Sequence, residues 1–147
     1  MRTGDKPLPD RPEFTASHVT ICVSDLARAE AFYAALGFER LYAMEPPEAF
    51  KQLLERPDAP ALAMVAMQNA GLRIELLSCG AEPPAAAAPR IGPRHLSLRV
   101  NDLAAAAAHV VRAGGAANLQ TRMQSGGGEF LMAADPDGLR LLLMHTP

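Results

Sequence analysis

The sequence has little cysteine, little net charge and no long apolar run, and each shortage excludes a class of protein. Its 147 residues include two cysteines, Cys22 and Cys79, which are too few for a disulfide framework and too far apart for a CxxC metal or redox motif. We therefore expect free thiols in a reducing cytosol. The formal net charge of −2 gives no basic surface, so nucleic acid is not an expected partner.

No run of about 18 apolar residues occurs, so the sequence predicts no transmembrane helix and no membrane partner. Residues 1–13, MRTGDKPLPDRPE, are charged and rich in proline, and they lack the apolar segment of a signal peptide. This opening predicts a disordered tail. Together these features predict a cytoplasmic protein.

The chain repeats itself. HVTICVSDL at residues 18–26 matches HLSLRVNDL at residues 95–103, an offset of 77 residues that also relates Gly37 to Gly114. A predicted strand and the helix after it therefore recur without a gap.

A second pair of segments repeats at a shorter offset. GLRIELL at residues 71–77 matches GLRLLLM at residues 138–144, an offset of 67, so the first half holds ten more residues. We place this surplus in the proline-rich residues 46–60, because prolines disfavour a continuous strand. The segment is a candidate loop or lid.

Each half carries the pattern of a βαβββ module. Residues 18–23 and 95–100 alternate apolar and more polar side chains, as a strand with one buried face does. A helix follows in each half and ends at Gly37 or Gly114. Three extended segments complete each half: 38–44, 61–68 and 72–79 in the first, and 117–123, 129–134 and 139–145 in the second.

The repeat also predicts the domain organisation. We expect one α+β domain built from two tandem βαβββ modules, residues 14–80 and 93–147, joined by a linker at residues 81–92. The predicted N-caps are Ser24 or Asp25 for the first helix and Asn101 or Asp102 for the second.

Two histidines and one glutamate fall on the same predicted side of the sheets. If the apolar strand faces cover the helices, His18, His95 and Glu75 project from the opposite side. Two imidazoles and a carboxylate suit a divalent metal such as Zn, Ni, Mn or Fe. A single histidine is more often packed or exposed than a ligand, but these two occupy equivalent repeat positions. Arg73, on the face of Glu75, offers that carboxylate a purely structural salt bridge instead.

These motifs resemble a known family. HVTICVSDLARAEAFYAALGF, the second HLSLRVNDL, and DPDG followed by a strand are similar to the vicinal oxygen chelate superfamily, over residues 16–145. This superfamily includes glyoxalase I, methylmalonyl-CoA epimerase, extradiol dioxygenases, and fosfomycin and bleomycin resistance proteins. The resemblance implies the glyoxalase/bleomycin resistance/dioxygenase fold, in which paired modules curl around a cavity that a second subunit often completes.

The resemblance also implies where ligands lie. In the glyoxalase-like branch they come from the first and last strands of each module, which here gives His18, Glu75 and His95, with Leu142 in place of the usual fourth ligand, a glutamate. Leu142 can neither bind metal nor carry a proton, which disfavours authentic glyoxalase I activity. Glu129 is the replacement base nearest in sequence, although a solvated glutamate at a strand end is the more common situation.

Several functions therefore remain open. The first is a metal-dependent lyase or isomerase of glyoxalase type acting on a small substrate with vicinal oxygens, with Glu75 and Glu129 as candidate catalytic residues. The alternative is a non-catalytic protein that binds a small molecule or antibiotic, as bleomycin resistance proteins do. An extradiol dioxygenase fits less well, because relatives of that kind place their glutamate at the position of Leu142. The resemblance favours a homodimer, whose pairing would cover exposed sheet edges. Arg73, Arg99 and Arg140 are candidates for holding an anionic substrate group.

Overall fold

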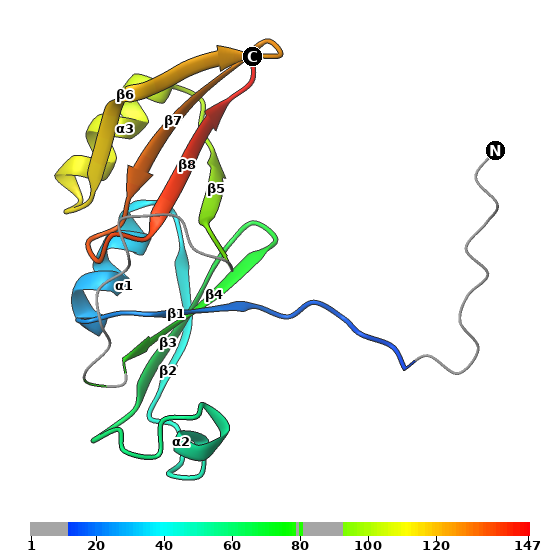
Figure 1. Ribbon diagram of the computed structural model, residues 1–147, viewed down its shortest axis with the longest axis vertical. Helices are drawn as coiled ribbons and strands as arrows, with labels where there is room; N and C mark the ends of the chain where they lie inside the picture. Colours follow the sequence, from blue (N-terminus) through cyan, green and yellow to red (C-terminus); the bar gives the residue numbers. More distant parts are fainter. Residues whose placement is uncertain (1–11, 79, 81–92) are drawn as a thin grey trace.

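The computed structural model describes residues 12–78, 80 and 93–147 (Figure 1). The predicted linker, Cys79 and nearly all of the predicted tail lie outside these residues. Within the described part of the chain, no helix is long and apolar enough to cross a membrane.

The first module is a four-stranded sheet with a helix on one face. Strands β1 and β4 are parallel neighbours, while β3 runs antiparallel to both β4 and β2, giving the order β1-β4-β3-β2. The elements are β1 (Val19–Cys22), α1 (Leu26–Ala35), β2 (Glu39–Met44), β3 (Ala63–Asn69) and β4 (Leu72–Ser78).

The second module repeats this arrangement. Its sheet has the order β5-β8-β7-β6, again with the first and last strands parallel and adjacent. The elements are β5 (His95–Arg99), α3 (Leu103–Arg112), β6 (Ala116–Ser125), β7 (Gly128–Ala134) and β8 (Arg140–His145). The predicted α+β fold of two βαβββ modules is confirmed.

Both long helices begin and end where the sequence indicates. Of the alternative caps, Asp25 and Asp102 act as N-caps, and each carboxylate accepts a hydrogen bond from the backbone N–H three residues later. After each helix, Gly37 and Gly114 have φ angles of 89° and 102°. Only glycine adopts this left-handed conformation without strain, which explains why the chain turns there.

The surplus segment of the first half forms no strand but contains a short helix, α2 (Phe50–Leu53). Figure 1 shows α2 at the end of the first module that lies away from the second module. The chain around α2 contributes to a small apolar cluster with strands β3 and β4, made of Leu54, Ala59, Leu62, Met64 and Leu77. The segment therefore covers one end of the sheet face opposite α1.

The two modules share one hydrophobic core. Apolar side chains of β1, β3 and β4 and of α1 join those of α3, β7 and β8 in a single buried cluster. Phe32 and Tyr33 of α1 lie in this core and are 1% and 0% exposed. Gly115 permits this close approach, because a Cβ there would lie 2.4 Å from the carbonyl oxygen of Ala134 and 2.8 Å from the Phe32 ring.

Two aspartates of the turn between β7 and β8 bind the first module. The buried Tyr33 hydroxyl donates to Asp135 over 2.8 Å, while Asp137 accepts from the backbone N–H and hydroxyl of Ser24 and from Arg28. Figure 1 shows this turn next to α1. Burial raises the pKa of Tyr33, and the neighbouring Asp135 raises it further. The turn therefore joins the modules through polar contacts as well as apolar packing.

We expect Asp135→Asn to flatten the pH dependence of the free energy of unfolding. Burial raises the pKa of Asp135 above its ordinary value of 3.8, so the folded protein binds this proton more tightly than the unfolded chain does. The resulting stabilisation is complete when both states are protonated, and it is lost as the pH rises through the folded pKa. Asparagine has no such proton to lose.

Urea unfolding between about pH 4 and 7 measures this effect. Asp58→Asn is a matched control, because the Asp58 side chain is 83% exposed. An equally steep loss of stability with pH in wild type and Asp135→Asn would contradict the prediction.

Candidate functional site

His18 and Glu75 meet on the sheet face that points away from α1. Thr20 of β1 pairs in register with Glu75 of β4, so His18, two residues earlier, lies on the same side of the sheet. Its Nε2 lies 2.9 Å from Oε2 of Glu75. The carboxylate is buried, with 7% of the residue exposed, whereas 31% of the His18 side chain is accessible.

Two further side chains bind the other oxygen of Glu75. Arg73 Nη2 donates to Oε1 over 2.9 Å, and the Tyr42 hydroxyl donates to the same oxygen over 3.0 Å. The guanidinium also donates to the Tyr42 hydroxyl and lies 5.3 Å from the centre of its ring. The salt bridge considered for Arg73 is therefore present.

Tyr42 reaches Glu75 across an intervening strand. In the register of the sheet, Ala66 of β3 pairs with Tyr42 on one side and with Glu75 on the other. The small side chain of Ala66 leaves room for the tyrosine ring to span the gap. Sequence reasoning missed Tyr42, because its position depends on cross-strand register, which includes an irregularity between Arg40 and Tyr42.

The distance between His18 and Glu75 is that of a direct hydrogen-bonded ion pair, and it also lies in the range expected for two ligands of one metal ion. Two ligand atoms that bind one ion at about 2.0–2.2 Å, at angles of about 90° to 110°, lie roughly 2.8–3.6 Å apart. The observed 2.9 Å falls in this range. Ser17 Oγ lies 2.8 Å from His18 Nδ1, and a hydroxyl can donate to this nitrogen or accept from it. Ser17 can thus support either tautomer and hold the ring in place, as outer-shell partners of histidine ligands do.

His95 does not join this pair within one chain. It begins β5 on the second sheet and pairs in register with Arg140 of β8. Its Nδ1 is buried and has no hydrogen-bond partner among the described residues. Across residues 12–78, 80 and 93–147, no group of three or more His, Cys, Asp or Glu side chains could hold a metal ion. A single chain therefore brings together two of the three predicted ligands.

Leu142 occupies the place in the second module that Glu75 holds in the first. It pairs with Ser97 of β5 and Met132 of β7, as Glu75 pairs with Thr20 of β1 and Ala66 of β3. Leu142 is half-buried and alternates with the buried Leu141 and Leu143. It therefore lies on the face that corresponds to the face of Glu75.

Glu129 lies on the other side of the second sheet from Leu142. It pairs with His145, whereas Met132 pairs with Leu142, and odd and even positions of these strands face opposite sides. Hydrogen bonds from Gln124 and Arg122 lower the pKa of Glu129. Glu129 and His145 line a hollow of about 530 Å³ together with the turn at residues 126–128. This placement does not favour a role for Glu129 as a base acting beside Leu142.

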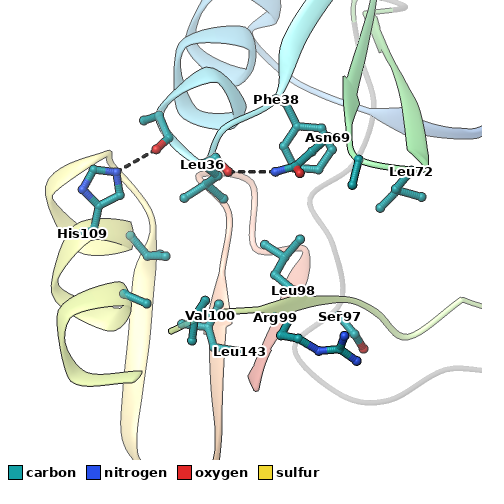
Figure 2. A pocket seen from close by; sticks show the side chains of 14 residues that line it. Leu36, Phe38, Asn69, Leu72, Ser97, Leu98, Arg99, Val100, His109 and Leu143 are labelled. Carbon is teal, nitrogen blue, oxygen red and sulfur yellow. Dashed lines mark hydrogen bonds between the residues drawn. The ribbon is translucent and has the colours of Figure 1, made fainter. Parts of the chain in front are cut away.

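A separate cavity of about 430 Å³ lies between the modules (Figure 2). Its wall is mainly apolar and includes Leu36 and Leu98. Two polar lining residues already have partners, since His109 Nε2 lies 2.7 Å from the Ala35 carbonyl oxygen and Asn69 donates to the Leu36 carbonyl over 3.2 Å. Figure 2 shows both contacts at the end of α1. His109 therefore connects α3 to α1 rather than entering the candidate site.

Comparisons with known proteins agree with this architecture. The family model for the Glyoxalase/Bleomycin resistance protein/Dioxygenase superfamily matches residues 15–143. Similar solved structures include a glyoxalase family protein from Enterococcus faecalis, with 23% identity, a TM-score of 0.69, and coverage of 88% of this chain and 96% of that one. A glyoxalase family protein from Bacillus cereus has 16% identity and a TM-score of 0.78, with coverage of 94% and 97%.

A third solved structure is the fosfomycin resistance protein FosX from Listeria monocytogenes, in complex with Mn(II) and a sulfate ion. It has 15% identity and a TM-score of 0.62, with coverage of 90% of this chain and 93% of that one. No curated protein matches the sequence. At these identities the structural likeness concerns the fold alone.

We expect Glu75→Gln to lower the free energy of unfolding by about 1–2 kcal/mol, because it leaves the Arg73 charge without its anionic partner. Removing one member of a fully buried pair costs about 3–5 kcal/mol, and the 31% exposure of Arg73 reduces this cost. Glu30→Gln is the matched control, because Glu30 pairs with the more exposed Arg40 and should lose less than about 1 kcal/mol. Chemical denaturation measures both variants, and equal losses would contradict the prediction.

Proposed function

Because this chain belongs to the Glyoxalase/Bleomycin resistance protein/Dioxygenase superfamily, we propose that it is a metal-dependent lyase or isomerase acting on a small substrate with neighbouring oxygens. The observation that carries the proposal is the 2.9 Å approach of His18 Nε2 to Glu75 Oε2 on one face of the first sheet. The imidazole and carboxylate donors suit Zn, Ni, Mn or Fe.

The ligands would be His18 and Glu75 together with His95. A bound divalent ion supplies Lewis acidity toward a substrate oxygen. The chain's own residues orient these ligands: Ser17 holds the His18 ring, and Tyr42 and Arg73 fix Glu75 through Oε1. The first ligand pair is thus preorganised by neighbouring side chains.

The proposed chemistry differs from that of glyoxalase I at one position. At the place where the resemblance implies a glutamate, this chain has Leu142, which has no group that accepts a proton. Glu75 is therefore the carboxylate that we assign to this face, both as a ligand and as the candidate proton acceptor. A reaction that needs two carboxylates on one substrate is not supported by this arrangement.

We propose that a second copy of the chain supplies His95. Within one chain, His95 lies on the second sheet and does not join His18 and Glu75 among the described residues. Exposed apolar side chains along two edge strands, including Leu41 on β2 and Leu119 on β6, provide surface that a homodimer would cover.

The alternative function is binding without catalysis. Two features favour it. Leu142 and Met132 make the corresponding face of the second module apolar. Arg73 and Tyr42 satisfy one oxygen of Glu75, and His18 lies 2.9 Å from the other, so the carboxylate has partners without a metal. A protein of this kind would enclose an apolar small molecule or antibiotic.

We expect purified wild type to bind a divalent metal stoichiometrically and His18→Ala to lose it, because the variant removes one of two preformed ligands. Elemental analysis after loading with Zn, Ni, Mn or Fe measures the content. His109→Ala is the matched control, because His109 lies outside the site. If wild type holds none of the four metals at saturation, the catalytic proposal fails and binding without catalysis is favoured.

Mixing variants tests whether the site forms between two copies. We expect His18→Ala and His95→Ala each to lose metal, and an equal mixture, unfolded and refolded together, to regain about a quarter of the wild-type content. Half of the dimers would then combine both variants, and one of their two sites would be intact. No recovery in the mixture would place all ligands within one chain.

We expect Leu142→Glu to raise metal affinity roughly tenfold or more, because it places a carboxylate at the position in the second module that corresponds to Glu75 in the first. Competition with a chromogenic chelator measures the dissociation constant. Met144→Glu is the control, since Met144 lies two residues further along the same strand face. Unchanged affinity in Leu142→Glu would show that this position does not face the metal.

A further inference from the structure

We propose that Arg73 is the anion-binding residue of the candidate site, so that the substrate carries a carboxylate or a similar anionic oxygen group beside its neighbouring oxygens. This inference rests on the proposed function and specifies the substrate class for the same site. It depends on the hydrogen-bonding state of one guanidinium.

Arg73 keeps unused hydrogen-bond donors next to the proposed ligands. A guanidinium has five N–H donors on three nitrogens, and both observed hydrogen bonds, to Glu75 and to Tyr42, use the same nitrogen, Nη2. Nε is buried and has no partner among the described residues. A buried charged donor without an acceptor is costly. No described side chain supplies an acceptor for Nε, and 31% of the Arg73 side chain is exposed, so a ligand at this exposed part can bring an acceptor to the guanidinium.

The other two arginines considered for this role are placed differently. Arg99 is exposed and lines the cavity between the modules, as Figure 2 shows. Arg140 donates from Nη1 to the Gly138 carbonyl in the second module. Arg73 alone among the three contacts Glu75. An anionic group on Arg73 would therefore lie beside the metal ligands.

The charges of the site would couple anion binding to metal binding. In the chain by itself, the single negative charge of Glu75 offsets the positive charge of Arg73 across 2.9 Å. When the Glu75 carboxylate neutralises part of the charge of a divalent ion instead, the net charge around Arg73 becomes more positive. Guanidinium binds carboxylate strongly and with defined geometry, so an anionic substrate group restores neutrality.

Tyr42 limits where that group can bind. Its hydroxyl contacts both the guanidinium and Glu75, and 39% of the residue is exposed. The ring lies against the Arg73 guanidinium, which it partly covers. Tyr42 and Glu75 therefore occupy Nη2 of Arg73, so an anionic group would bind the other nitrogens of the guanidinium.

Pyruvate and methyl pyruvate form a matched pair of probes, because both carry neighbouring oxygens and only pyruvate is an anion. Isothermal titration on the full chain, with and without saturating Zn, gives the ratio of their dissociation constants. A metal also attracts a carboxylate, so the informative quantity is the change in this ratio on substitution. We expect Arg73→Met to reduce the preference for pyruvate over methyl pyruvate about tenfold. Arg73→Lys should reduce it less, because lysine keeps the positive charge but lacks the paired N–H donors with which a guanidinium binds a carboxylate.

Arg40→Met is the control, because Arg40 pairs with Glu30 and not with a residue of the site. This variant should prefer pyruvate over methyl pyruvate to the same extent as wild type. Thermal unfolding establishes that each variant is folded; if Arg73→Met is not, Arg73→Lys decides. An unchanged preference in the folded variants, or no preference in wild type, overturns the role of Arg73.

Metal content measured on the same samples separates the two proposals. Stoichiometric metal without an Arg73-dependent preference overturns the inference and leaves the metal site standing. A preference that depends on Arg73 in protein that binds no metal supports the anion site and overturns the metal-dependent function. Protein that binds no metal and shows no preference that depends on Arg73 overturns both the metal-dependent function and the anion site.

Discussion

Each sheet has to bury one face beneath a helix, and this requirement decides where the polar side chains of the strands can go. Ile74 and Leu76 are fully buried on the face of the first sheet that packs against α1, so Glu75 between them must point to the opposite face. There it would be a costly isolated charge, and three side chains offset that cost. The candidate site is therefore a consequence of how the sheet packs, and its residues also contribute to the stability of the fold.

The sequence predicted most of the fold because its signals were local. Alternating residues indicated the strands, and Asp25, Asp102, Gly37 and Gly114 marked the ends of both helices. The site was less predictable, because Tyr42 depends on cross-strand register and Glu129 on which side of β7 it occupies. Helix α2 was missed within a segment that the prolines indicated as a loop or lid. That His95 and His18 bind the same metal remains a prediction, because it depends on how two copies of the chain assemble.

The two modules share a fold but differ in the chemistry of their exposed sheet faces. The first has a carboxylate with three donors around it, whereas the second has Leu142 at the corresponding place, with Ser97 and Met132 as its neighbours in register. The strand accepts glutamate or leucine at this place, because Glu75 and Leu142 each lie between buried leucine or isoleucine residues that hold the strand in the sheet. A duplicated fold can thus retain its core while one half changes polarity.

The contact between Tyr33 and Asp135 also affects how the duplicated chain behaves as a folding unit. A fragment restricted to the first half would leave Phe32 and Tyr33 facing water, and one restricted to the second half would lose the phenol that satisfies a buried carboxylate. Neither half is therefore suited to independent folding. The chain holds within itself an interface that a single, unduplicated module would need another molecule to provide.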